Sequence, residues 1–118
     1  MILAAISLAY AVCAAEGVRI ICVHDGDSFI VDRERIRIAD IDTPELDGQG
    51  RYESELAVRA RYRLTQLLNA ETFEIRRQGE DRYGRKRAFV ANSQGSIGDQ
   101  LVREGLARTR TKRREPLC

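Results

Sequence analysis

Three short segments rich in β-branched residues follow one another in the first third of the chain, with a turn signal between the first two. They span residues 18–23, 28–32 and 35–41. The pair Asp25-Gly26 predicts the first turn. In the third segment Ile36 and Ile38 alternate with two arginines, which is typical of a strand with one buried face. Short strands clustered this early predict a small α+β domain or a barrel.

The rest of the chain has the pattern of two helices and two further strands. The first helix is marked by Leu56, Ala60, Leu64 and Leu67, and the strands cover residues 72–76 and 87–91. Ser96 and Asp99 form a capping-box pattern at the start of the second helix, and Gly105 stands where that helix should end. A length of 118 residues leaves room for one domain. We place it at residues 16–107, followed by an irregular basic tail at 108–118.

The N-terminal residues 1–15 carry no charged side chain and end in small residues around Cys13. This pattern resembles a signal peptide that is cleaved after Ala14 or Ala15, although the usual basic start is missing. The alternative is a buried first strand or helix. The run is shorter than the roughly 20 residues that a membrane span needs. We therefore expect a secreted or periplasmic protein whose mature form has no stable membrane association.

The three cysteines also bear on whether the N-terminal segment is cleaved. Cleavage after Ala14 or Ala15 would remove Cys13 and leave Cys22 and Cys118, an even number that permits one disulfide in an exported domain. The alternative is two unpaired thiols. The cysteines are not spaced as zinc ligands, and one histidine cannot build a zinc site alone.

Charge is unevenly distributed along the chain. Between Asp25 and Glu55 there are ten acidic and four basic residues, a net charge of −6, so the remaining residues carry +8 of the total +2. An acidic centre within a basic surround suits a cation site that handles a polyanion, and it also suits an ordinary surface with many salt bridges.

Three other short segments, at residues 25–27, 37–45 and 81–85, combine the residue types that phosphate chemistry requires. Asp27, Asp42 and Glu45 offer hard oxygen ligands, which suit Ca²⁺ or Mg²⁺. Arg37 and Arg85 offer forked donors that fit phosphate oxygens. Each segment alone has the simpler interpretation of a turn or loop. Together they supply a metal site, a spare carboxylate base and two arginines, the parts needed to hydrolyse a phosphodiester.

The order of these segments also resembles a known family. The runs VHDGDSF, RIRIADIDTPE, DRYGRKRAFV and QLVREGLA resemble, in this order and spacing, the staphylococcal nuclease (thermonuclease) family over residues 18–107. The resemblance implies an α+β fold, an OB-type five-stranded β-barrel with two packed helices. From the same resemblance we expect the family's third helix to be missing here.

The resemblance also implies a metal site and a base. Asp27 and Asp42 would bind one Ca²⁺ through their carboxylates, and Thr43 would add its backbone carbonyl. Glu45 would act as the general base that deprotonates the attacking water.

The same resemblance assigns the residues around the phosphate. Arg37 and Arg85 would stabilise the five-coordinate phosphorus, and Tyr83 would bind the substrate. Strand alternation alone could not choose between Arg35 and Arg37, because both lie on one face. The interval from Arg37 to Asp42 follows the family motif, so Arg35 is interpreted as a solvated neighbour.

The expected activity is calcium-dependent hydrolysis of DNA and RNA at the P–O5′ bond, leaving 3′-phosphate ends, by a monomer. The family's substrate-stacking tyrosines are replaced here by a basic run that includes Arg108 and Arg110. We therefore expect weaker and more charge-dependent binding, because base stacking contributes roughly 1–3 kcal/mol per base. The alternatives are a non-catalytic OB-fold module that binds nucleic acid or protein, and a poorly folded remnant of a gene.

Overall fold

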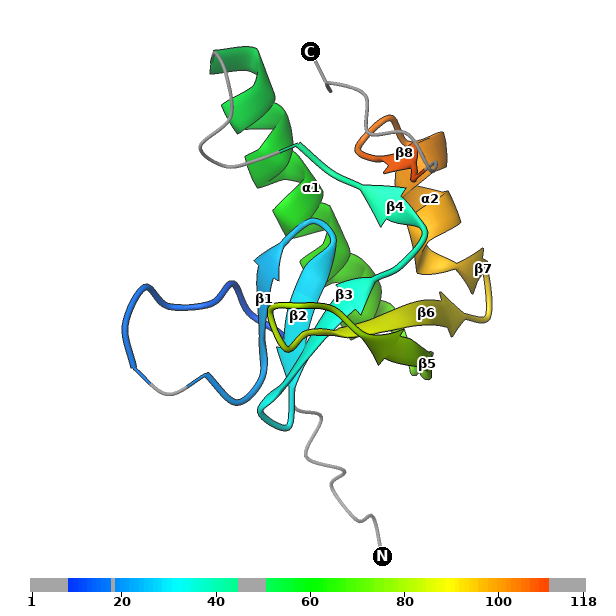
Figure 1. Ribbon diagram of the computed structural model, residues 1–118. Helices are drawn as coiled ribbons and strands as arrows, with labels where there is room; N and C mark the ends of the chain where they lie inside the picture. Colours follow the sequence, from blue (N-terminus) through cyan, green and yellow to red (C-terminus); the bar gives the residue numbers. More distant parts are fainter. Residues whose placement is uncertain (1–8, 18, 45–50, 111–118) are drawn as a thin grey trace, which may run out of the picture.

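A computed structural model of the 118-residue chain describes residues 9–17, 19–44 and 51–110. Its main sheet has the strand order β1-β2-β3-β6-β5, with β7 paired to β6 (Figure 1). These strands are β1 (Cys22–Asp25), β2 (Ser28–Val31), β3 (Glu34–Ile38), β5 (Glu74–Glu80), β6 (Lys86–Asn92) and β7 (Gly95–Ser96). Pairing is antiparallel except between β3 and β6, which run parallel. The α+β fold expected from the sequence is confirmed, and the main sheet has six strands because the short β7 joins the five that were expected.

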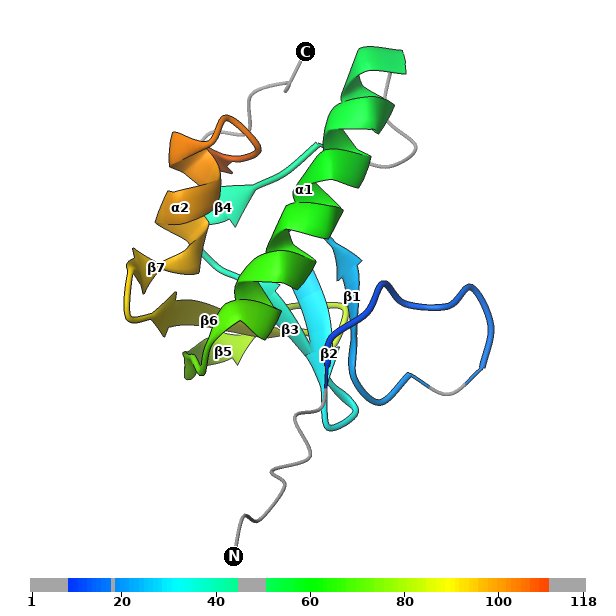
Figure 2. The same cartoon turned by 180° about the vertical axis from the view of Figure 1, so that it is seen from behind.

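Two helices pack against this sheet. Helix α1 (Arg51–Ala70) crosses one face of it, as Figure 2 shows, and helix α2 (Ile97–Arg103) follows β7. The Asp99 amide donates to the Ser96 hydroxyl over 3.1 Å, which confirms the predicted cap. Gly105 has a φ of +75°, the left-handed conformation that glycine adopts easily after a helix.

The core lies between α1 and the inner face of the sheet. Strand alternation buries Val23, Phe29 and Ile36, each at most 1% exposed, on the same side of β1, β2 and β3. From the helix, Ala60 and Leu64 meet them and are fully buried. The helical spacing found in the sequence therefore marks the face of α1 that packs on the sheet.

The barrel differs from the expected closed form. Strands β1 and β5 are the two ends of the sheet path, and no pairing joins them within the described part of the chain. The free edge of β1 instead pairs with an N-terminal segment, because the Val23 amide donates to the Ala11 carbonyl over 2.7 Å and the Cys13 amide to the Val23 carbonyl over 2.9 Å. The N-terminal segment of the same chain therefore covers that edge of β1.

A separate two-stranded ladder corrects the expectation of an irregular tail. Strand β4 (Ile41–Asp42) pairs antiparallel with β8 (Arg108–Thr109), and Asp42 lies opposite Arg108. The Arg110 amide then donates to the Asp40 carbonyl over 2.8 Å. The first residues of the basic tail are thus fixed beside the loop that follows β3.

The disulfide joins Cys13 to Cys22, with the two Cα atoms 4.8 Å apart. This corrects the expected pairing of Cys22 with Cys118, which lies outside the described residues. Cys13 is held next to Cys22 because residues 11–13 pair with the edge of β1.

The N-terminal segment also contacts the core. Tyr10 packs edge-on against Phe29, with ring centroids 6.0 Å apart, and exchanges hydrogen bonds with the Asn69 side chain. Cleavage after Ala14 or Ala15 stays a prediction, and it would remove these contacts together with the disulfide. No helix in the described ranges is long and apolar enough to cross a membrane.

Candidate active site

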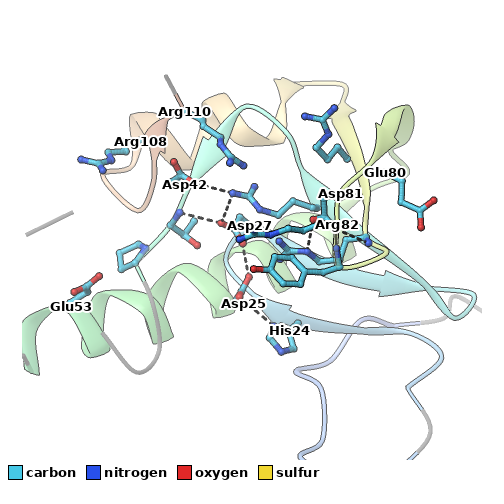
Figure 3. A pocket seen from close by; sticks show the side chains of 16 residues that line it. His24, Asp25, Asp27, Asp42, Glu53, Glu80, Asp81, Arg82, Arg108 and Arg110 are labelled. Carbon is cyan, nitrogen blue, oxygen red and sulfur yellow. Dashed lines mark hydrogen bonds and ion pairs between the residues drawn. The ribbon is translucent and has the colours of Figure 1, made fainter. Parts of the chain in front are cut away.

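An open cavity of about 870 Å³ lies where the turns and strand ends of both sheets meet the N-terminal part of α1 (Figure 3). Its lining residues are His24, Asp25, Asp27, Arg37, Asp42, Thr43, Pro44, Glu53, Glu80, Asp81, Arg82, Tyr83, Arg85, Arg87, Arg108 and Arg110. Six arginines and six carboxylates thus face one cavity, which confirms the mixed charge inferred from the sequence.

The turn between β1 and β2 carries Asp27 into this cavity. A Cβ atom on Gly26 would lie 2.7 Å from Ala60 Cβ and 2.9 Å from Thr43 Cγ2, so only glycine lets the turn approach α1 and Thr43 this closely. Asp27 is 8% exposed, and the Thr43 amide donates to its Oδ2 over 3.3 Å. The turn motif therefore places a buried carboxylate next to the chain that follows β4.

Asp25 supports Asp27 from within the same turn. The Ser28 hydroxyl donates to Asp25 Oδ1 over 2.7 Å, and the Asp27 amide donates to the same oxygen over 3.3 Å. His24 Nδ1 lies 3.3 Å from Asp25 Oδ2. Burial alone would raise the pKa of Asp25, but the hydrogen bonds from these neighbours outweigh it and hold the pKa below its usual range. Burial raises the pKa of Asp27, and the contact with Asp25 raises it further.

Arg37 is the centre of the cluster. Its Nη1 donates to the carbonyls of Ile38 and Ile41, the latter over 2.9 Å. Its Nη2 donates to Asp42 Oδ1 over 2.9 Å and lies 3.4 Å from Asp27 Oδ2. The side chain is 7% exposed. These bonds orient one guanidinium fork toward the two carboxylates that the sequence predicted as metal ligands.

The donor set fits a hard cation. Asp27 and Asp42 both contact Nη2 of Arg37, and the Thr43 amide contacts Asp27, so two carboxylates of the kind that Ca²⁺ prefers lie close together. The raised pKa of Asp27 indicates that one guanidinium does not offset the charge of this buried cluster. Within the described residues no group of three or more His, Cys, Asp or Glu side chains has the geometry of a metal site. Glu45, the expected general base, lies outside the described residues.

Asp81 organises the turn between β5 and β6 that carries Arg85. Its Oδ1 accepts hydrogen bonds from the amides of Tyr83 at 2.9 Å and Arg85 at 3.0 Å, and its Oδ2 accepts one from Arg85 Nε at 2.8 Å. Burial would raise the pKa of Asp81, and these hydrogen bonds lower it overall. Gly84 has a φ of +78° in this turn. Arg35 donates to the Tyr83 carbonyl, so a residue expected to be merely solvated holds the turn to β3.

Tyr83 stands at the rim of the cavity with 58% of its surface exposed. The guanidinium carbons of Arg82 and Arg85 lie 5.0 Å and 5.5 Å from its ring centroid. Cation–π contacts at this distance restrict the ring and the two side chains together. An exposed aromatic face beside positive charge suits an unpaired base.

The ladder of β4 and β8 adds two arginines that were expected to lie in an irregular tail. Arg108 and Arg110 line the side of the cavity that lies away from the Asp81 turn, as the labelled side chains in Figure 3 show. The alternating run Arg-Thr-Arg-Thr from Arg108 is the signal that could have identified this strand. Glu53 was assigned only to a helix start, and it lines the cavity while being 8% exposed.

The structure brings most of the predicted site residues together. The predicted residues that line this cavity are Asp27, Arg37, Asp42, Thr43, Tyr83 and Arg85. An OB-type sheet that carries a carboxylate pair beside two arginine forks belongs to the class of domains that can hold a phosphate ester next to a cation.

Comparisons with known proteins agree with this class. Residues 35–117 match the family model described as Staphylococcal nuclease homologue. A thermonuclease from Staphylococcus hyicus is 32% identical over 104 residues, a match that covers 78% of this chain and 58% of the relative. The chain thus spans less than two thirds of the relative's length. It belongs to the staphylococcal nuclease family.

Proposed function

We propose that this chain is a calcium-dependent nuclease that hydrolyses DNA and RNA at the P–O5′ bond and leaves 3′-phosphate ends. The observation that carries the proposal is the convergence of Asp27, Asp42 and Arg37 on one point of a cavity that Arg85 also lines. Membership of the family and the thermonuclease relative support it.

The carboxylates of Asp27 and Asp42 and the carbonyl of Thr43 would hold the ion. When bound, Ca²⁺ would supply positive charge next to the phosphate. Asp42 would then exchange part of its contact with Arg37 for the ion, which leaves Nη2 of Arg37 able to donate to a phosphate oxygen.

The remaining roles follow from charge and proton balance. Glu45 would accept a proton from the attacking water, whose oxygen forms the new bond to phosphorus. The bond from phosphorus to the 5′-oxygen breaks, and that oxygen leaves with the electron pair and takes up a proton from the solvent to form a hydroxyl group. Arg37 and Arg85 would stabilise the additional negative charge on the phosphoryl oxygens, a contribution that is large where donors are fixed in advance.

Substrate attraction would depend on the arginines at the cavity rim. Arg82, Arg87, Arg108 and Arg110 surround the carboxylate cluster with positive charge. Such a rim favours a polyanion of any sequence and weakens with added salt. We infer that the protein is exported, since a disulfide persists most readily in an oxidising compartment, and we propose that it acts as a monomer.

The experiment is hydrolysis of single-stranded DNA and RNA by the purified chain, with Ca²⁺ and with chelator. Arg37→Ala tests the site, and Arg59→Ala, an exposed change on α1, controls for loss of one positive charge. Calcium-dependent cleavage that is lost only in Arg37→Ala supports the nuclease. Binding without cleavage by a folded sample would instead identify a non-catalytic binding module.

A further inference from the structure

A second cavity of about 330 Å³ adjoins the candidate active site. It shares three lining residues with the larger cavity: His24, Tyr83 and Arg85. Its other walls are Arg19, Arg35 and three buried residues of β2, Ser28, Phe29 and Ile30. A volume of this size is at the lower end of the range for small-molecule sites, and it suits one nucleotide.

Strand geometry links the two cavities. Arg35 and Arg37 lie two residues apart on β3, so both project from the face opposite the core, about 6.6–6.8 Å apart along the strand. In the register of β2 and β3, Arg37 lies opposite Ser28 and Arg35 lies opposite Ile30. The sheet face that positions Arg37 at the carboxylate cluster therefore continues directly into the second cavity.

Two arginines are fixed at the wall of this cavity by backbone carbonyls. Arg35 donates to the Tyr83 carbonyl, and Arg19 Nε donates to the Ala14 carbonyl over 3.2 Å. A guanidinium has five N–H donors, so one such bond leaves it able to bind a phosphate as well. The two groups come from separate parts of the chain, and both line the same cavity.

Tyr83 lines both cavities. Its ring is more than half exposed, and Arg85 lies beside it. Ile30 also lines this cavity and adds an apolar contact, although only 6% of its surface is exposed. A flat aromatic ring, an apolar side chain and two arginine forks are the elements that bind an unpaired nucleotide without sequence preference.

We propose that the second cavity binds the nucleotide that flanks the scissile phosphate in a single-stranded nucleic acid. Its base would stack on Tyr83 next to Ile30, and its phosphate would bind Arg35 and Arg19. The proposal rests on the proposed function, because it places the scissile phosphate at Arg37 and Arg85. A duplex does not fit this arrangement, because paired bases cannot stack on Tyr83.

The test is binding of fluorescent oligothymidylates of increasing length, from the dinucleotide upward, measured by anisotropy in chelator so that no cleavage occurs. Arg19→Ala and Arg35→Ala should each weaken binding of the longer oligonucleotides about five- to tenfold. The dinucleotide should bind as it does to the unaltered chain. The slope of log affinity against log salt should fall by about 0.7 for each arginine removed. Arg59→Ala is the matched control, because it removes one exposed charge from α1, outside both cavities.

Arg35 also holds the Tyr83 turn, so two comparisons separate binding from positioning. Displacement of that turn would weaken binding of the dinucleotide as much as binding of longer oligonucleotides. Arg19→Ala leaves the contact between Arg35 and the turn in place. Arg35→Lys should recover most of the salt slope, because it restores the charge. Equal loss at all lengths in both alanine variants would overturn the proposal, as would binding indistinguishable from Arg59→Ala or equally strong binding of a duplex.

Parallel cleavage assays with Ca²⁺ distinguish the two proposals. If the unaltered chain cleaves nothing, but the two alanine variants lose binding of the longer oligonucleotides, the nuclease proposal fails and the nucleotide site stands. If it cleaves DNA while both variants bind every length normally, the nuclease proposal stands and the nucleotide site fails.

Discussion

Arg37 Nη2 donates to Asp42 Oδ1 over 2.9 Å, and this bond closes a ring of contacts through the chain between β3 and β4. The same guanidinium donates to the carbonyls of Ile38 and Ile41, so the side chain is anchored by the segment that leads to Asp42. The five-residue interval between Arg37 and Asp42 is therefore the length of chain that folds back onto its own arginine. This explains why the interval is a useful sequence signature.

Replacing Arg37 tests both stability and activity. At pH 8 and above, where Asp27 is ionised, Arg37→Ala should lower the unfolding free energy by about 3–5 kcal/mol, because it leaves the buried Asp27 and the half-buried Asp42 without their cation. It should reduce hydrolysis by about 10²–10³-fold through the loss of a fixed donor. Arg37→Lys keeps the charge but not the fork, so it should recover stability more than activity. Urea unfolding and steady-state kinetics would show this, and equal recovery of both would contradict it.

Gly26→Ala tests the close approach of the first turn to α1. The new methyl group would meet Ala60 Cβ at 2.7 Å, and relieving that clash should cost about 1–3 kcal/mol of stability. Activity should fall as well, because Asp27 is the next residue. Adding Ala60→Gly removes the nearest atom, so the double variant should lose less stability than the two single changes summed. Strict additivity in thermal unfolding would show that this contact does not limit the turn.

The metal-free protein should lose stability as pH rises. Burial and Asp25 raise the pKa of Asp27 from 3.8 to about 8, so the folded state holds this proton more tightly than the unfolded state. The resulting stabilisation is complete below the unfolded pKa and is lost between about pH 4 and pH 8. Asp27→Asn has no such proton to lose. In chelator at the upper end of this range it should be about 1–4 kcal/mol more stable than the unaltered chain.

Thermal unfolding across this pH range gives the comparison, and Ca²⁺ serves as the control. The ion should stabilise the unaltered chain at high pH and have less effect on Asp27→Asn, since it binds the ionised carboxylate. A parallel pH dependence for the two proteins would contradict the assignment to Asp27.

Local patterns in the sequence were sufficient to predict most of the fold. The alternation through Ile36 and Ile38 and the helical spacing from Ala60 to Leu64 specify which face of each element is buried, and burial of those faces brings the elements together. The turn at Asp25–Ser28 and the interval from Arg37 to Asp42 act in the same way, because each is held by hydrogen bonds between residues close in sequence.

The features that the sequence did not predict depend on contacts between distant segments. Arg35 meets the Tyr83 carbonyl only because β3 and β6 pair in parallel, and strand alternation carries no information about that partner. Strand β8 is two residues long and exists because β4 offers it an edge. The pairing of Cys13 with Cys22 likewise follows from the position of residues 11–13 beside β1, which composition alone cannot reveal.

Asp81 should act on catalysis through Arg85. Asp81→Ala removes the acceptor for two turn amides and for Arg85 Nε, so Arg85 should lose its fixed direction. We expect kcat to fall by about 10–100-fold with a smaller change in KM, since misplacement of a catalytic group by about 1 Å has an effect of this order. Asp81→Asn keeps an oxygen for the amides and should be intermediate. A change confined to KM would indicate that the turn serves binding alone.

The disulfide gives a prediction about where the mature chain begins. With Cys13 joined to Cys22, one of the three cysteines remains, so the folded chain should show one free thiol before reduction and three after it. Replacing Cys13 and Cys22 by serine should lower stability by about 2–3 kcal/mol, the loop-closure contribution for so short a loop. Thiol counting and peptide mapping of the exported protein would decide between the two N-terminal interpretations. Recovery of the Cys13–Cys22 peptide pair would mean that residues 10–13 are retained as part of the fold, and a mature chain that begins after Ala15 would contradict it.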